Sequence, residues 1–118
     1  KKIISSYAMK VNIPLKPLSV NVAWKGRRFK SDLYKNWIED GLFLLQKQEV
    51  NDSEQLQLNI EFGFSSKGSD IDNPIKPLLD LITKKYGIND NRFYKLYIKK
   101  KVVKKGKEYI KFEIKELL

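Results

Sequence analysis

The sequence contains neither cysteine nor histidine. The absence of cysteine excludes disulfides, thiolate zinc sites and thiol catalysis, and it suits a reducing cytoplasm. The absence of histidine removes the commonest general base, the Ser-His and Cys-His nucleophile pairs and every imidazole metal site. Any chemistry must therefore use carboxylates, lysine, hydroxyl groups or a cation bound through hard oxygen ligands.

Long apolar runs and low-complexity segments are also missing. No apolar stretch approaches the ~20 residues that cross a bilayer, and no stretch combines the basic start, apolar core and small-residue cleavage site of a secretory signal. We therefore expect a cytoplasmic protein with no membrane partner. With 118 residues, of which 42% are hydrophobic, the chain has the usual size of one domain, and we expect a single domain over residues 1–118.

Acidic residues are scarce relative to basic ones. The 24 Lys and Arg residues exceed the 14 Asp and Glu residues, which leaves a formal net charge of +10. Such an excess favours a polyanionic partner, and nucleic acid is the first candidate. The alternative is that a lysine-rich composition reflects an AT-biased genome, so the arrangement of the charges has to decide.

Four segments have the pattern of β-strands. Apolar and polar residues alternate over Tyr7–Ile13 and, most clearly, over Leu56–Phe64, which predicts half-buried strands. The β-rich runs Phe93–Val103 and Lys107–Lys115 predict two more. We expect these last two to form a hairpin through Lys104–Gly106, because glycine accepts the positive φ of a tight turn.

Two helices are predicted between these strands. Apolar residues recur at helical spacing from the N-cap Ser31 to about Gln48. A second helix is predicted from the N-cap Asn73, with Pro74 at its first position, to Tyr86. The order β-α-β-α-β-β predicts an α+β fold in which two helices pack on a mixed four-stranded sheet.

Three aspartates flank the second predicted helix. Asp70 and Asp72 are two residues apart in an extended segment, so both can project to one side about 6–7 Å apart and bracket a cation. Asp90 follows the helix, and the returning chain could bring it beside the helix start. Such carboxylates select Mg²⁺ or Mn²⁺, which suits phosphodiester hydrolysis. The alternative is that Asp70 and Asp72 only cap the helix, whose N-terminal dipole favours negative charge.

Lys76 lies one turn into this helix, on the side that faces the strand end. It could hold the scissile phosphate or stabilise the developing charge, or it could form an ordinary i,i+4 salt bridge with Asp80. We expect Asp80 to support Lys76 rather than to bind metal. An EF-hand calcium loop is excluded, because Ile75 and Leu81 occupy the positions that require Gly and Glu.

The segment Asp-Ile-Asp-Asn-Pro-Ile-Lys-Pro-Leu-Leu-Asp over residues 70–80 resembles the hallmark of the RusA family of Holliday junction resolvases. That hallmark is Asp-x-Asp-Asn, a Lys three residues later, an Asp four further on, and a later acidic pair. The matching residues are Asp70, Asp72, Asn73, Lys76, Asp80 and the pair Asn89-Asp90. Upstream, Pro17–Asn21 is similar to the family's proline-then-Asn segment, and a basic loop with Arg27 and Arg28 follows it.

The resemblance implies a metal-dependent DNA endonuclease that acts as a homodimer. Such enzymes bind four-way junctions and nick two strands symmetrically with Mg²⁺ or Mn²⁺, and they are common in phages and prophages. In this chain Asp70, Asp72 and Asp90 would bind the metal, and Lys76 would complete the catalytic set. The later pair usually has two aspartates, whereas this chain has Asn89 first, so we expect altered metal affinity more than loss of activity.

Lysines gather in the last two predicted strands. Lys95, Lys99 and Lys101 share one strand face with Tyr97 and could form a track for phosphates. The alternative is a solvated edge strand that lysines protect against aggregation. The residues expected to bind DNA are Arg27, Arg28, Lys67, Lys95, Lys99 and Lys101.

The leading hypothesis is therefore a structure-selective DNA endonuclease that resolves Holliday junctions. One rival is a catalytically weak or silent protein that binds branched DNA and in which the aspartates are helix caps. Another is a phage regulatory or interaction protein on the same scaffold. Metal-dependent cleavage of branched DNA would distinguish the enzyme from both rivals.

Overall fold

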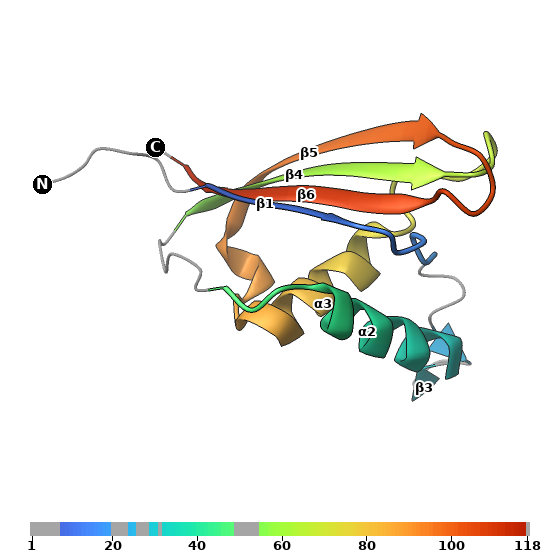
Figure 1. The fold of residues 1–118 in the computed structure, drawn as a ribbon. Helices are drawn as coiled ribbons and strands as arrows, with labels where there is room; N and C mark the ends of the chain where they lie inside the picture. The colour runs from blue at the N-terminus through green and yellow to red at the C-terminus, as the bar shows by residue number, and fades with distance from the viewer. Residues whose placement is uncertain (1–7, 20–23, 26–28, 31, 49–54, 118) are drawn as a thin grey trace, which may run out of the picture.

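The computed structural model describes residues 8–19, 24–25, 29–30, 32–48 and 55–117. Their order confirms the predicted α+β fold, with two helices on a mixed four-stranded sheet (Figure 1). The elements are β1 (Ala8–Ile13), β2 (Trp24–Lys25), β3 (Phe29–Lys30), α2 (Asp32–Leu44), β4 (Leu56–Phe64), α3 (Ile75–Tyr86), the 3₁₀ helix η1 (Asp90–Arg92), β5 (Phe93–Val102) and β6 (Tyr109–Glu116).

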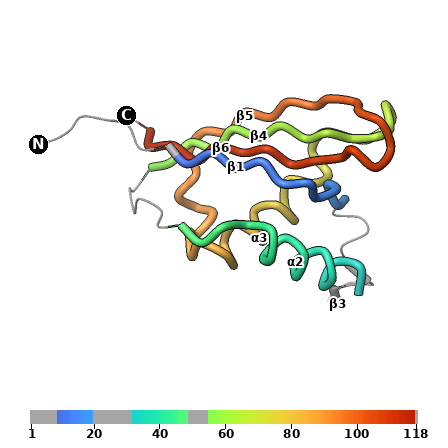
Figure 2. The backbone as a smooth tube through the Cα atoms, viewed as in Figure 1, coloured from blue at the N-terminus to red at the C-terminus, as the bar shows by residue number. Residues whose placement is uncertain are grey.

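The sheet has the strand order β1-β6-β4-β5. β6 pairs antiparallel with both β1 and β4, whereas β5 pairs parallel with β4. β4 therefore lies between β5 and β6, and the predicted hairpin is wrong. The link between these two strands passes the end of β4 instead (Figure 2). The inward residues of β4 are buried along the whole strand, as expected of a strand that is paired on both sides.

The turn within that link nevertheless forms as predicted. The backbone N–H of Lys107 donates to the carbonyl of Lys104 at 2.9 Å. Gly106 adopts φ +91°, which is the conformation that favours glycine. A local turn signal is thus correct even though the strands on either side of it do not pair.

The helix limits differ from the prediction by a few residues. α2 ends at Leu44, before the expected Gln48. α3 has Pro74 as its N-cap, without a side-chain cap hydrogen bond, so the expected N-cap Asn73 is wrong by one position. Asn73 uses its side chain elsewhere, donating to Asp70 Oδ2 at 3.4 Å. A short antiparallel ribbon of β2 and β3, with Trp24 opposite Lys30, precedes α2. It was not predicted, because each strand has only two residues.

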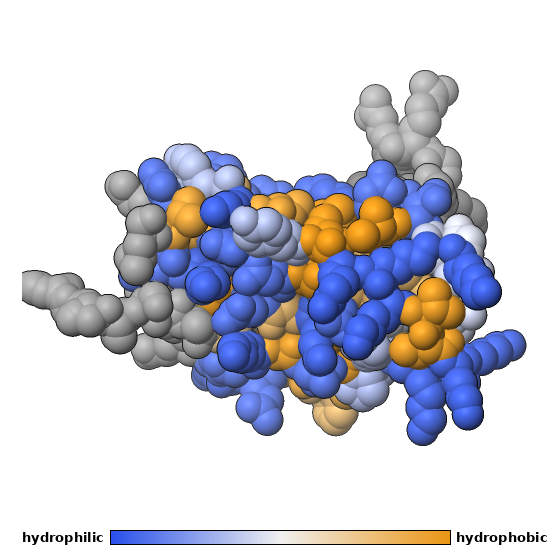
Figure 3. Space-filling view, turned by 90° about the horizontal axis from the view of Figure 1, so that it is seen from above, coloured by the Kyte–Doolittle hydropathy of each residue, from blue (hydrophilic) through white to orange (hydrophobic). Residues whose placement is uncertain are grey.

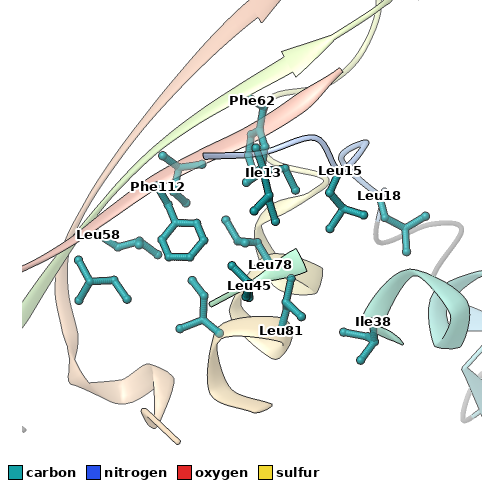
Figure 4. Close-up of a cluster of buried hydrophobic side chains, with 14 of the residues drawn as sticks. Ile13, Leu15, Leu18, Ile38, Leu45, Leu58, Phe62, Leu78, Leu81 and Phe112 are labelled. Carbon is teal, nitrogen blue, oxygen red and sulfur yellow. The ribbon is translucent and has the colours of Figure 1, made fainter. Parts of the chain in front are cut away.

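The core lies between the helices and one face of the sheet (Figure 1). Leu58, Phe62 and Phe112 project from the strands toward Leu78 and Leu81 of α3 (Figure 4), and each of these side chains is buried. Burial of this many apolar side chains, each contributing about 1.5–3 kcal/mol, holds α3 against the sheet. The start and end of α3 are therefore fixed relative to β4, and these are the two places where the predicted site residues lie.

Trp37 of α2 lies in this core. Its side chain is 7% exposed, and its indole N–H donates to the carbonyl of Lys16 at 2.6 Å. On the same helix, Leu33 is 53% exposed.

Candidate functional site

Lys76 forms the centre of a small ionic network at the first turn of α3. Its Nζ lies 3.4 Å from Asp80 Oδ1, one turn along the helix, and 3.5 Å from Asp90 Oδ2 in η1. The two carboxylates raise the pKa of Lys76, chiefly through the charge of Asp80. The ammonium group is therefore charged at neutral pH and lies between the carboxylates of Asp80 and Asp90.

Asp80 is itself positioned by a buried side chain. The hydroxyl of Tyr34, on α2, donates to Asp80 Oδ2 at 2.8 Å. Tyr34 is 2% exposed, and its burial together with Asp80 raises its pKa. Tyr34 therefore stays neutral and acts as a donor, so the core fixes Asp80 and Asp80 fixes Lys76. The contact between Lys76 and Asp80 is also the i,i+4 salt bridge that the alternative interpretation of Lys76 predicts.

A cleft of about 490 Å³ runs along these residues. Lys76, Asp80 and Asp90 line it together with Asn89 and Lys84. Because the side chain of Lys76 remains 56% exposed, its charge is available to a ligand in the cleft.

Asn89 has a structural role in this loop. Its side-chain oxygen accepts a hydrogen bond from the backbone N–H of Asn91 at 3.1 Å, which makes it the N-cap of η1. Asparagine and aspartate serve equally well at such a position. The cap explains why an amide is accommodated where the resemblance led us to expect an acid.

Asp70 and Asp72 lie apart from that network. Asp70 borders a smaller pocket of about 140 Å³, shared with Asn73 and Glu108. Asp72 is exposed. Its backbone carbonyl accepts from the N–H of Ile75 at 3.2 Å, and its carboxylate forms no hydrogen bond or ion pair with any described residue.

The expected grouping of three carboxylates is not formed by the described residues, because no three acidic side chains among them are arranged to hold a metal ion. The chain after α3 brings Asp90 within 3.5 Å of the ammonium of Lys76, whose side chain extends from the first turn of the helix. Asp70 and Asp90 line different pockets. The donor chemistry still fits a hard cation, because exposed carboxylates are ligands that Mg²⁺ prefers.

The predicted basic residues of β5 share one face of the sheet. Lys95, Tyr97, Lys99 and Lys101 stand beside the outward residues of β4 in the parallel register. The Nζ of Lys95 lies 5.6 Å from the centre of the Tyr97 ring. This places the expected phosphate track on the face that the helices leave open (Figure 1).

The other expected DNA contacts are distributed differently. Lys67 is exposed in the loop after β4, and its carbonyl accepts from Lys100 Nζ at 2.8 Å. The same ammonium donates to the carbonyl of Ser69 at 2.6 Å. Lys100 thereby ties the loop that carries Asp70 to β5. Arg27 and Arg28 lie outside the described residues.

Sequence reasoning missed Glu61, which lies at the middle of the open face. Its carboxylate accepts a hydrogen bond from the hydroxyl of Tyr109 and forms ion pairs with Lys99 at 3.5 Å and Lys111 at 3.9 Å. The Tyr109 hydrogen bond is the main reason that the pKa of Glu61 is lowered. Burial and Glu61 raise the pKa of Tyr109 to about 12. The signal that could have identified Glu61 is its charge on the polar side of a strand that the sequence predicts clearly.

Comparison with protein-family models found no match for this chain, and comparison with curated protein sequences found no significant match. In the part of the chain that the structure describes, no helix is long and apolar enough to cross a membrane.

Proposed function

We propose that this protein is a metal-dependent endonuclease that cuts branched DNA, with four-way junctions as the substrate class. The observation that carries the proposal is the placement of Lys76. Two carboxylates hold its ammonium at 3.4 and 3.5 Å, yet the side chain is 56% exposed beside a cleft. An ammonium group that is held in position before the reaction stabilises the charge that develops on a phosphate, because the group does not have to reorient during the reaction.

The residues that would hold the cation are Asp70 and Asp72, because Asp90, which was expected to join them, lines a different pocket from Asp70 and is paired with Lys76. When bound there, Mg²⁺ or Mn²⁺ would supply an activated water and would offset the charge of the phosphate. Mg²⁺ commonly uses one or two carboxylates and completes its shell with water and substrate phosphates. These two aspartates are therefore sufficient, which is compatible with the ion pair that Asp90 makes with Lys76.

In this proposal the chain's own residues have distinct tasks. Lys76 contacts the scissile phosphate, and Asp80 keeps Lys76 charged and oriented through the contact that Tyr34 anchors. The lysines of β5, which lie on the face that the helices leave open, would contact phosphates of another segment of the junction. The protein acts as a homodimer, because symmetric nicks in a four-way junction require two equivalent sites related by a two-fold axis.

A second candidate is a protein that binds branched DNA without cutting it. The ion pair between Lys76 and Asp90 favours this reading, because it neutralises Asp90 without a cation. The two candidates differ in one measurable property, which is cleavage that depends on a divalent metal.

The test is cleavage of a labelled four-way junction in Mg²⁺, in Mn²⁺ and in EDTA. We expect paired nicks only with metal. Asp70→Asn and Asp72→Asn should abolish cleavage while junction binding stays the same or tightens, because each removes a metal ligand and also a charge that repels phosphate. Asp40→Asn is the matched control, since Asp40 is an exposed aspartate on α2, and it should cut like the parent.

The outcomes separate the candidates. A protein that binds the junction but cuts it with neither metal corresponds to the second candidate. Cleavage by Asp72→Asn at the wild-type rate would refute the assignment of Asp72 as a metal ligand. Sedimentation should show about twice the mass of one chain. In addition, a mixed dimer with one Asp72→Asn subunit should nick only one strand per binding event.

A further inference from the structure

The face of the sheet that the helices leave open carries a strongly basic set of side chains. The register of the four strands places six lysines on this face among the described residues, against two glutamates. The lysines are Lys10, Lys95, Lys99, Lys101, Lys111 and Lys115.

The two glutamates of this face are already satisfied within the sheet. Glu61 is held by Tyr109 and by two lysines. Glu113 accepts from Asn59 Nδ2 at 3.0 Å, and Asn59 in turn accepts from Gln57 Nε2 at 2.9 Å. Lys10 and Lys101 make no ion pair with the described residues, so a net positive charge remains for an external anion.

The same face contains a shallow hollow of about 590 Å³. Tyr97 borders it and is 54% exposed, together with Asn12 and Asn59, whose amide groups can donate and accept hydrogen bonds. Seen from above, hydrophobic surface lies between hydrophilic side chains on this face (Figure 3). An exposed aromatic ring, amides and lysines are therefore collected on one open sheet.

We propose that this open face is a binding platform for single-stranded nucleic acid, in which Tyr97 stacks on a base and the surrounding lysines contact phosphates. Open sheets bind single strands in this way, because an unpaired base offers a π-face to an aromatic ring while a basic surface follows the backbone. The inference deepens the proposed function, since it names single-stranded segments of a branched substrate as the part bound here. It rests on that function only for the choice of nucleic acid as partner and requires neither metal nor cleavage.

Two other occupants fit the face less well. A duplex keeps its bases stacked inside, so it offers nothing for Tyr97 to stack on. A second copy of this chain packed face to face would bring two sets of six lysines together, and like charges across an interface oppose association. Charge and aromatic exposure together thus favour a single strand.

The test is fluorescence anisotropy with a labelled oligodeoxythymidylate of about 12 nucleotides, a length within the range that one such domain covers. EDTA is present, so cleavage cannot contribute. We expect binding that weakens with salt, with a slope of about 0.7 per phosphate contact. Tyr97→Ala should raise Kd about 5- to 150-fold, whereas Tyr97→Phe should bind within about twofold of the parent, because it keeps the ring.

Controls come from the helical layer. Phe43 of α2 is 88% exposed, so Phe43→Ala removes an exposed ring elsewhere and should leave Kd unchanged. Lys10→Gln should lower the salt slope by about 0.7, and Lys35→Gln, which removes an exposed lysine of α2, should not. Matching circular dichroism and melting curves establish that Tyr97→Ala is folded.

Three results would overturn the platform. The first is equal affinity of Tyr97→Ala and the parent for the oligonucleotide. The second is junction binding without single-strand binding in EDTA, which leaves the proposed function intact. The third is a dimer of the parent protein that dissociates when Tyr97 is replaced by alanine, because this result would show that the face is an interface between two copies of the chain. Conversely, Tyr97-dependent binding without metal-dependent cleavage supports the platform and refutes the nuclease.

Discussion

Replacing Gly63 by alanine tests the contact that holds the open face together. Gly63 of β4 pairs with Tyr109 of β6. A Cβ at Gly63 would overlap Cε2 and Cδ2 of the Tyr109 ring and would stand 2.9 Å from its Cζ. Since carbon atoms pack at about 3.5–4.0 Å, the ring has to move. Its hydroxyl would then leave Glu61, to which it donates.

The cost follows from what the ring gives up. A hydrogen bond to a charged group contributes about 1.5–3 kcal/mol. Part of this is recovered, because Glu61 keeps its two lysine partners and gains contact with water. When the lost packing of the ring is added, the substitution removes about 2–3 kcal/mol from the free energy of unfolding. Alanine restores about 0.5–1 kcal/mol, because glycine is unfavourable inside a strand. The expected loss is about 1–2.5 kcal/mol in the free energy of unfolding.

Urea denaturation followed by circular dichroism measures this loss, with a double-mutant cycle as the decisive comparison. In a Tyr109→Ala background, Gly63→Ala should be neutral or stabilising, because the ring is gone. Gly68→Ala is the control: its Cβ would meet only Ser66 Oγ, at an ordinary 3.6 Å, so stability should change by less than about 0.5 kcal/mol. Equal destabilisation by Gly63→Ala in both backgrounds would refute the contact.

Three further predictions concern the support of the site. Tyr34→Phe removes the donor to Asp80 and should lower the free energy of unfolding by about 1–2 kcal/mol; an unchanged urea midpoint would contradict this. Gly41→Ala places a Cβ 2.6 Å from a methyl group of the fully buried Leu81. The destabilisation by overpacking, about 1–3 kcal/mol, should exceed the ~1 kcal/mol gained in helix propensity. Thermal unfolding should therefore show a lower Tm. The lowered pKa of Glu61 means that its contribution to stability is present above its unfolded pKa of about 4.5 and is lost as pH falls through the folded value. Glu61→Gln should therefore be less stable at neutral pH but show a flatter acid limb in melts between pH 7 and pH 3, and parallel acid limbs would argue against it.

The elements of this protein could be predicted because burial acts locally on each of them. β4 was predicted residue for residue, since its inward positions alternate without interruption. The turn at Gly106 could be predicted because glycine readily adopts the positive φ that the turn requires. The pairing of Lys76 with Asp80 also follows from helix geometry, in which residues four apart are neighbours.

The tertiary structure alone decided which distant elements meet. Strand patterns do not say which strand takes the centre, so β5 and β6 were expected to pair, whereas β4 separates them. The same uncertainty applies to Asp90, because a carboxylate brought back to a helix start can meet a cation or a lysine, and Lys76 is the group that the fold places there. The open face belongs to this class too, since Glu61 and Tyr109 lie 48 residues apart and become neighbours only through strand register. Sequence by itself determines period and turn chemistry, which are local; strand order and charge pairing depend on the packing of the whole chain.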